Sequence, residues 1–148
     1  MGGVAGHMDH LYDNPDLTFS NFTTRIIVNS SGLYANNISS MVGINETNTK
    51  LQFWKGSYFW IDNHKVGTIK TLIYPIPNDH LTGLGIHLTK DINGRIKIGP
   101  DAEYVGENRN FNYLVDNDKR ESFYNSCKSY LPFLNIDDIH PDYSGIRP

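Results

Sequence analysis

The sequence predicts an α+β fold, in which a mainly antiparallel sheet is packed by one helix and preceded by a partial strand–turn–helix unit. Five short β-type runs, separated by Gly, Pro and Asn, lie between residues 51 and 99. Short turns between such runs favour antiparallel pairing. Apolar residues at helical spacing recur over residues 116–131. A cluster of strands followed by a helix is typical of the α+β class.

The first fifty residues are expected to hold two different segments. Residues 1–23 show no apolar periodicity, so a poorly ordered terminus is expected. The β-branched run 24–28 predicts a buried strand, and residues 29–32 predict a tight turn. Residues 33–42 have the apolar spacing of an amphipathic helix, which Gly43 would cap. The expected parts of the chain are therefore 1–23, 24–50 and 51–148.

The strands of the expected sheet are the runs 51–54, 57–62, 68–74, 84–89 and 95–99. Asn93 and Gly94 stand between the last two runs and predict a hairpin with a two-residue type I′ turn. The sheet is expected to extend over about residues 51–105.

The second helix is expected over residues 116–131, where Phe123, Cys127 and Leu131 share one apolar face. Asp116 or Asn117 would be its N-cap, and the following Pro132 would end it. The remaining residues, 136–148, are expected to form a loop.

Composition and charge exclude several classes of protein. The 148 residues carry 13 Lys+Arg against 16 Asp+Glu, and a net charge of -3 disfavours a nucleic-acid partner. One cysteine excludes an internal disulfide framework and a multi-cysteine zinc site. No apolar run approaches the ~20 residues of a membrane-spanning helix. No secretory signal is visible, so a cytoplasmic location is expected.

Three side chains are candidates for chemistry. His87 stands in the apolar run 84–89, where a titratable ring needs either a hydrogen-bond partner or a function, and both alternatives stay open. Cys127 is expected to be a buried, inert thiol. Arg147 stands beside Gly and Pro residues, which fits a solvated surface or, because the guanidinium is planar, a carboxylate ligand. No set of residues predicts a metal site.

Six strings follow one another along the chain: IVNSSGLYA at 27–35, KGSYF at 55–59, IYPIP at 73–77, GLGIHLT at 83–89, GRIKIGPDAE at 94–103 and PDYSGIRP at 141–148. In this order and spacing they resemble FAD-dependent oxidoreductases of the D-amino-acid-oxidase superfamily. The resemblance is greatest to the branch that contains L-2-hydroxyglutarate dehydrogenase, and it covers about residues 24–148.

The resemblance implies oxidation of a 2-hydroxy acid or an amino acid, with hydride passing from the α-carbon to FAD. It implies that the sheet is a substrate-binding domain and that residues 24–50 are a strand–turn–helix piece of the FAD-binding domain. His87 would be catalytic, and Tyr58 and Arg147 would bind the substrate, Arg147 near its carboxylate. Ser31 and Gly32 would lie close to FAD, because a glycine lets the backbone approach the phosphates or ribose.

Members of this family begin with a strand–G-x-G-x-x-G–helix unit and end with another glycine-rich segment at the flavin. Neither pattern is found in this sequence. An internal or split fragment is therefore expected, which binds no FAD and is inactive alone. Its partners would be separately encoded parts of the enzyme or further copies of itself. The alternative is a non-catalytic binding or oligomerisation module that keeps only the fold of the substrate domain.

Overall fold

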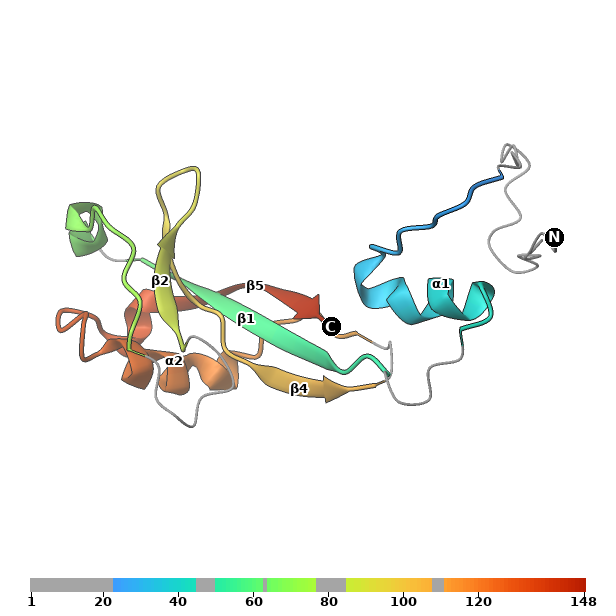
Figure 1. Cartoon of the computed structure of the whole chain (residues 1–148). Helices are drawn as coiled ribbons and strands as arrows, with labels where there is room; N and C mark the ends of the chain where they lie inside the picture. Colours follow the sequence, from blue (N-terminus) through green and yellow to red (C-terminus); the bar gives the residue numbers. More distant parts are fainter. Residues whose placement is uncertain (1–22, 45–49, 63, 77–84, 108–110) are drawn as a thin grey trace, which may run out of the picture. The chain divides into compact units, whose positions relative to one another are not determined.

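The computed structural model describes residues 23–44, 50–62, 64–76, 85–107 and 111–148 (Figure 1). The chain divides into two compact units, residues 1–51 and 52–148, and each is treated by itself below. The expected disorder of residues 1–23 falls, apart from Thr23, outside the described residues. The second unit has a five-stranded antiparallel sheet with a packed helix, so the predicted α+β class is confirmed.

The first unit contains the predicted turn and helix. A 3-10 turn at Gly32–Tyr34 leads into α1, Ala35–Met41. The N–H of Gly43 donates to the carbonyl of Ser40, and the N–H of Ile44 donates to the carbonyl of Ser39. With a φ of +82° at Gly43, these bonds form a Schellman cap, as the glycine after the helix predicts.

The strand predicted over residues 24–28 is wrong, because these residues have no regular structure. Ile26, Ile27 and Val28 are 78%, 64% and 82% exposed, and no described strand pairs with them. β-Branched residues favour a strand only where a neighbouring strand satisfies the backbone and packs on the side chains. Within residues 23–44 no such neighbour is present.

The centre of the second unit is one long strand, β1, Phe53–Ile61, where the sequence predicted two shorter ones. Its side chains alternate strictly between buried and half-buried positions. Odd-numbered residues therefore face the core and even-numbered residues face the opposite side of the sheet. Gly56 was expected to break the strand. The strand instead continues through Gly56. A Cβ at this position would lie 2.8 Å from the Cβ of Pro100, so the glycine allows the chain after β3 to pack closely on β1.

The other strands flank β1 on both edges (Figure 1). One edge of β1 pairs with β3, Ile96–Gly99, near Phe59 and with β4, Glu103–Gly106, near Trp54. The opposite edge pairs along almost its whole length with β5, Ile139–Arg147. The outer neighbour of β3 is β2, His87–Lys90. The predicted loop over residues 136–148 is thus wrong, since most of it is a strand of the central sheet.

The hairpin between β2 and β3 is confirmed, but its turn is of another type. The N–H of Gly94 donates to the carbonyl of Asp91, so the four-residue turn is 91–94. Asn93 and Gly94 therefore occupy its third and fourth positions, and Gly94 has a φ of +83°. The Asp91 carboxylate accepts from the backbone N–H groups of Asn93 and Arg95, which stabilises this longer loop.

The run 68–74 was expected to be a strand and is not one. A 3-10 helix, His64–Thr68, covers its start, and only Ile73 forms an isolated bridge, to Leu88 of β2. Pro75, two residues later, has no N–H to extend the pairing. The bridge still places residues 73 and 74 beside the outer edge of β2.

One layer of helix covers the core face of the sheet. A 3-10 turn at Asn117–Lys119 precedes α2, Arg120–Cys127, and the Asp116 carboxylate accepts from the N–H of Asp118, as predicted for an N-cap. Regular helix ends at Cys127, four residues earlier than expected. The buried core joins the sheet to the helical layer, and the ring centroids of Phe59 in β1 and Phe123 in α2 lie 4.5 Å apart.

Candidate functional site

Tyr58 and His87 lie in one row across the sheet. Phe59 pairs with Ile98, and His87 pairs with Gly99. The antiparallel register of β1 and β3 continues by one residue to place Tyr58 opposite Gly99. Residues directly opposite one another share a face of the sheet, so Tyr58, Gly99 and His87 share the face that points away from the core.

Gly99 occupies the middle of this row and keeps it free of a third side chain. Its φ of +134° is accessible almost only to glycine. A Cβ at this position would lie 2.7 Å from the carbonyl oxygen of Ser57 and 2.9 Å from Cδ1 of Tyr58. The ring of Tyr58 therefore lies directly against the backbone of Gly99.

His87 is nearly buried, with 9% of its surface exposed. Its Nδ1 lies 3.1 Å from the carbonyl oxygen of Gly85. A carbonyl only accepts hydrogen bonds, so Nδ1 carries the proton and Nε2 of the neutral ring keeps its lone pair. Tyr74 stacks on the ring with a centroid distance of 4.5 Å and an interplanar angle of 19°. The side chain is thus held both by a hydrogen bond and by ring contact.

Tyr58 stacks on Tyr143 of β5, with ring centroids 4.7 Å apart and an interplanar angle of 14°. Burial raises the pKa of Tyr58, and the nearby hydroxyls of Tyr143 and Tyr74 raise it further. The phenol consequently keeps its proton near neutral pH and can both donate and accept a hydrogen bond. Tyr143 reaches this position through a β-bulge, because the register of β1 and β5 shifts between Ser57 and Phe59.

A cation lies in the neighbouring row of the same face. Lys97 pairs with Trp60 across β3 and β1, and its Nζ lies 2.7 Å from a carboxylate oxygen of Asp142. The same Nζ lies 4.5 Å from the ring centroid of Tyr143. The Lys97 and Asp142 side chains are only 13% and 16% exposed, so this pair is well shielded from water.

Arg147 lies on the same face but at its other end. It pairs with Trp54, four residues along β1 from Tyr58, which corresponds to roughly 13 Å at the usual rise of a strand. The structure therefore brings Tyr58 and His87 into one row and leaves Arg147 two rows away. The roles of these three residues in substrate binding and catalysis stay predictions.

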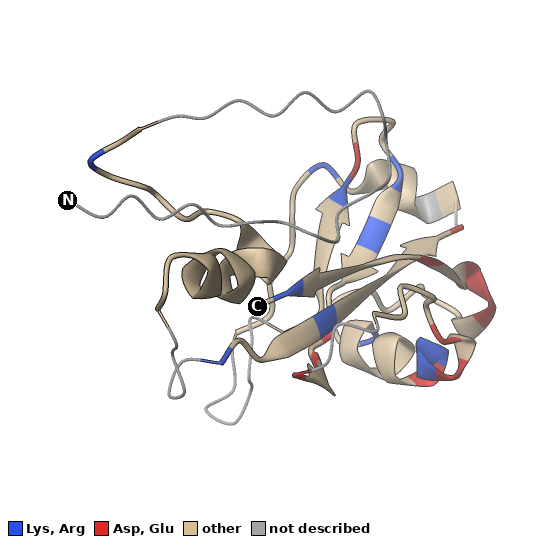
Figure 2. Cartoon of the chain, turned by 90° about the vertical axis from the view of Figure 1, so that its right-hand side faces the viewer, with Lys and Arg blue, Asp and Glu red and all other residues tan. Residues whose placement is uncertain are grey.

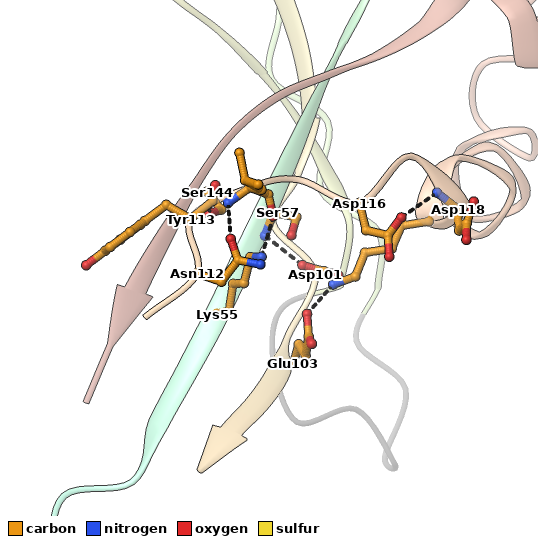
Figure 3. A network of polar contacts seen from close by, with 11 residues as sticks. Lys55, Ser57, Asp101, Glu103, Asn112, Tyr113, Asp116, Asp118 and Ser144 are labelled. Carbon is orange, nitrogen blue, oxygen red and sulfur yellow. Dashed lines mark hydrogen bonds and ion pairs between the residues drawn. The ribbon is translucent and has the colours of Figure 1, made fainter. Parts of the chain in front are cut away.

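A polar network fixes β1 from the core side (Figure 3). The Asp101 carboxylate accepts from the N–H of Ser57 at 2.6 Å and from Lys119 at 2.7 Å, and Lys119 also contacts Glu103. Burial would lower the pKa of Lys119, but its hydrogen bonds to Asp101 and Glu103 outweigh burial and raise it. Lys55 is buried and donates to the carbonyl of Leu114. Tyr58 thus projects from a rigidly held stretch of strand.

The turn at Ser31 and Gly32 belongs to the first unit. The Asn29 side chain accepts from the hydroxyl of Ser31 at 2.7 Å and donates to the carbonyl of Ala35 at 2.8 Å. Gly32 has a φ of +54°, and no atom lies within 4 Å of the position that a Cβ would take. The backbone of this turn is therefore open to close approach by another group, which fits a contact with FAD.

Charged residues of both signs are found in the second unit. Figure 2 shows basic positions on the strands, and both acidic and basic positions in and beside the helical segments. Among the described residues, no group of three or more His, Cys, Asp or Glu is close enough to hold a metal ion. In the same residues, no helix is long and apolar enough to cross a membrane.

Most of the site was not accessible to sequence reasoning. Four further residues lie on the face of Tyr58 and His87 only because of strand pairing and a bulge: Tyr74, Lys97, Asp142 and Tyr143. Asp142 lies in residues 136–148, which the sequence predicts to be a loop. The aromatic side chains at three of the four even positions of β1, with Gly56 at the fourth, could have indicated a second functional face from the sequence; they are Trp54, Tyr58 and Trp60.

Comparison with known proteins gives one family. The profile of the FAD dependent oxidoreductase family, DAO, matches residues 9–148. L-2-hydroxyglutarate dehydrogenase, mitochondrial, from Arabidopsis thaliana is 34% identical over an alignment 132 residues long, which covers 83% of this chain and 27% of that protein. L-2-hydroxyglutarate dehydrogenase from Escherichia coli K12 is 27% identical over an alignment 152 positions long, gaps included. This alignment covers 82% of this chain and 36% of that protein. The chain thus spans about a quarter to a third of the length of these relatives.

Proposed function

The chain belongs to the DAO family of FAD-dependent oxidoreductases, and from this we propose that residues 52–148 form the substrate-binding part of an enzyme that oxidises a 2-hydroxy acid. The substrate would resemble 2-hydroxyglutarate, the compound named in the similar dehydrogenases. The observation that carries the proposal is the row of Tyr58, Gly99 and His87 on the face opposite the core.

Each residue of the face has a property that the reaction needs. The lone pair on Nε2 of His87 would take the proton of the substrate hydroxyl, since Nδ1 already donates to Gly85. The neutral hydroxyl of Tyr58 would orient the substrate. Arg147 would bind a carboxylate as a planar donor. Lys97, in the row next to Tyr58, would contribute a second positive charge.

When bound, FAD supplies the acceptor for the hydride that leaves the α-carbon. Ser31 and Gly32 would contact it, because this turn leaves its backbone open. The Ser31 hydroxyl already donates to Asn29, so it would offer the cofactor an acceptor oxygen. That the chain alone binds no FAD stays a prediction, which flavin absorbance of the purified protein tests.

The proposal is tested by NMR titration of the complete chain with L-2-hydroxyglutarate. We expect shifts at Tyr58, His87 and Lys97, and weaker effects with glutarate, which lacks the hydroxyl. His87→Asn keeps a donor for Gly85 but removes the second ring nitrogen, so it should weaken binding. His140→Asn is the matched control, because His140 lies on the same face against Trp60. Shifts confined to other residues, or equal losses in both variants, would contradict the proposal.

A second candidate is a non-catalytic module that works through self-association. The exposed run Ile26–Val28 favours it, because contiguous exposed apolar residues often mark interaction sites. Light scattering over a range of concentrations distinguishes the two candidates, together with the titration. A self-associating chain that does not bind the hydroxy acid would favour the module, and a monomer that binds it would favour the enzyme.

The expected cytoplasmic location also stays a prediction, since some relatives are mitochondrial by name.

A further inference from the structure

We propose that Tyr130 is a positioning residue, which fixes the backbone next to His87 and thereby the proton position on the His87 ring. The proposal rests on the function inferred above for His87. Tyr130 lies in the turn that follows α2, and its hydroxyl is 3.0 Å from the carbonyl oxygen of Ile86. This contact joins the helical layer to the residue immediately before His87.

The direction of this hydrogen bond follows from its partners. The Ile86 carbonyl only accepts, so Tyr130 donates its single hydroxyl proton to it. Cys127 Sγ lies 2.9 Å from the same hydroxyl oxygen and therefore acts as the donor to Tyr130. The result is a chain of two hydrogen bonds, from the Cys127 thiol through Tyr130 to the backbone of Ile86.

Both donors keep their protons under ordinary conditions. Burial raises the pKa of Cys127 to about 11 and outweighs the hydrogen bond with Tyr130, which acts in the opposite direction. Burial also raises the pKa of Tyr130, and the contact with Cys127 raises it further. The hydrogen-bond chain is therefore intact throughout the neutral range.

The backbone that Tyr130 holds is the one that selects the tautomer of His87. Nδ1 of His87 donates to the carbonyl of Gly85, two residues earlier. Gly85 has a φ of +75°, and glycine has wide conformational freedom. Ile86 lies between the two partners and precedes β2, which begins at His87. Tyr130 thus restrains the Ile86–His87 peptide group, which is next to the Gly85–Ile86 peptide group whose carbonyl accepts from His87.

Loss of this restraint would release the Gly85 carbonyl from Nδ1. The neutral His87 ring would then carry its proton on either nitrogen, and Nε2 would hold a lone pair in only part of the molecules. A base that accepts a proton through Nε2 requires the Nδ1-protonated form. Tyr130 therefore acts on chemistry through His87 without touching the substrate.

The test is the long-range 1H–15N spectrum of the histidine rings in the complete chain, with His87 assigned from the signal missing in His87→Asn. The native protein should show His87 protonated at Nδ1. Tyr130→Phe should replace this pattern by a mixture of both tautomers. Cys127→Ala is the matched control, because it disturbs the same place but keeps the bond from Tyr130 to Ile86. Its His87 signals should stay native.

An unchanged His87 pattern in folded Tyr130→Phe would overturn the proposal, and so would an equal change in Cys127→Ala. Should Tyr130→Phe not fold, 3-fluorotyrosine placed at position 130 keeps the ring and strengthens the hydroxyl donor. A shifted His87 Nδ1 signal supports the proposal there, and an unshifted one refutes it. These readouts need no substrate, so they are independent of the hydroxy-acid titration.

Discussion

Replacing Gly99 by alanine should destabilise the second unit severely, because two separate effects coincide at this residue. The φ of +134° is strained for any L-residue, at a cost of about 1–3 kcal/mol. The new Cβ would also lie 2.7 Å from the Ser57 carbonyl oxygen and 2.9 Å from Tyr58, which adds an overpacking cost of about 1–3 kcal/mol. The two costs together predict a total loss of about 2–6 kcal/mol.

The assay is urea and thermal unfolding of the complete chain, followed by circular dichroism. A loss of about 2 kcal/mol or more should lower the melting temperature by about 10 °C or more in a unit of this size. Two matched variants separate the causes. Gly106→Ala meets a φ of +93° but no atom within 4 Å, so it should cost about 1–2 kcal/mol. Gly145→Ala has neither strain nor contact and should be nearly neutral.

The order of the three variants in lost unfolding free energy tests whether strain and close contact both act at Gly99. If Gly99→Ala were no more destabilising than Gly106→Ala, the close contact of the Gly99 backbone with Tyr58 would be refuted. The row of the candidate site would then lack the packing described for it. A folded Gly99→Ala protein should also show displaced Tyr58 ring signals in NMR spectra, which Gly145→Ala should not.

Three further predictions concern single interactions. Asp116→Ala removes the N-cap before α2 and should lower the unfolding free energy by about 1 kcal/mol in urea titrations. Cys127 should resist thiol reagents at pH 8 in the folded protein, because a pKa of about 11 leaves about one thiol in a thousand ionised. In urea, where the thiol is exposed, it should react at once. Fast reaction of the native protein would contradict the burial of Cys127. Lys119→Met breaks the contacts with Asp101 and Glu103 and should cost up to about 1 kcal/mol, less in high salt. Since the pKa of Lys119 is raised above 10.5, this contribution is fully present at pH 7 and is lost only as the pH rises past that range, which stability measured against pH would show.

Features set by local sequence could be predicted. Gly43 ends α1 because glycine adopts a positive φ without strain, and Asp116 caps the turn before α2 because a short carboxylate reaches a free N–H two residues on. The alternation around residues 96–99 gave β3 within one residue. In each case the residues that decide the structure are neighbours in the chain.

Features that depend on a partner distant in the sequence could not be predicted. Strand β5 contains Pro141 and Gly145, both poor strand residues, yet it pairs with β1, which is distant in the sequence: Ile61 pairs with Ile139, and Trp54 pairs with Arg147. Pro141 is tolerated because β5 has no further neighbour among the described strands, so its missing N–H removes no ladder bond on that side. The run 24–28 shows the converse, since strong strand propensity without a partner gives no strand.

The same reasoning applies to the site. His87 stood out because a polar ring in an apolar run is unusual, and Arg147 stood out as a planar cation beside Gly and Pro residues. The resemblance to a family added Tyr58 and gave Arg147 its expected role. Lys97 and Asp142 gave no such signal, because a lysine in an alternating strand and an aspartate near a proline are common. Their pairing depends on the bulge in β5, which no local pattern predicted.

The register also bears on which cation would meet a carboxylate under the proposed function. Tyr58 and His87 share one row, Lys97 stands in the next row, and Arg147 stands two rows away on the other side. A small acid whose hydroxyl lies at His87 is therefore nearer to Lys97. However, Lys97 already pairs with Asp142 at 2.7 Å, whereas none of the ion pairs among the described residues involves Arg147. The residues of β1 that pair with them, Trp60 for Lys97 and Trp54 for Arg147, stand six positions apart, which corresponds to roughly 20 Å at the usual rise of a strand, so one small acid would not bridge the two cations. Under the proposed function, a carboxylate bound beside His87 would therefore contact Lys97, whose ammonium group has three donors and uses one for Asp142.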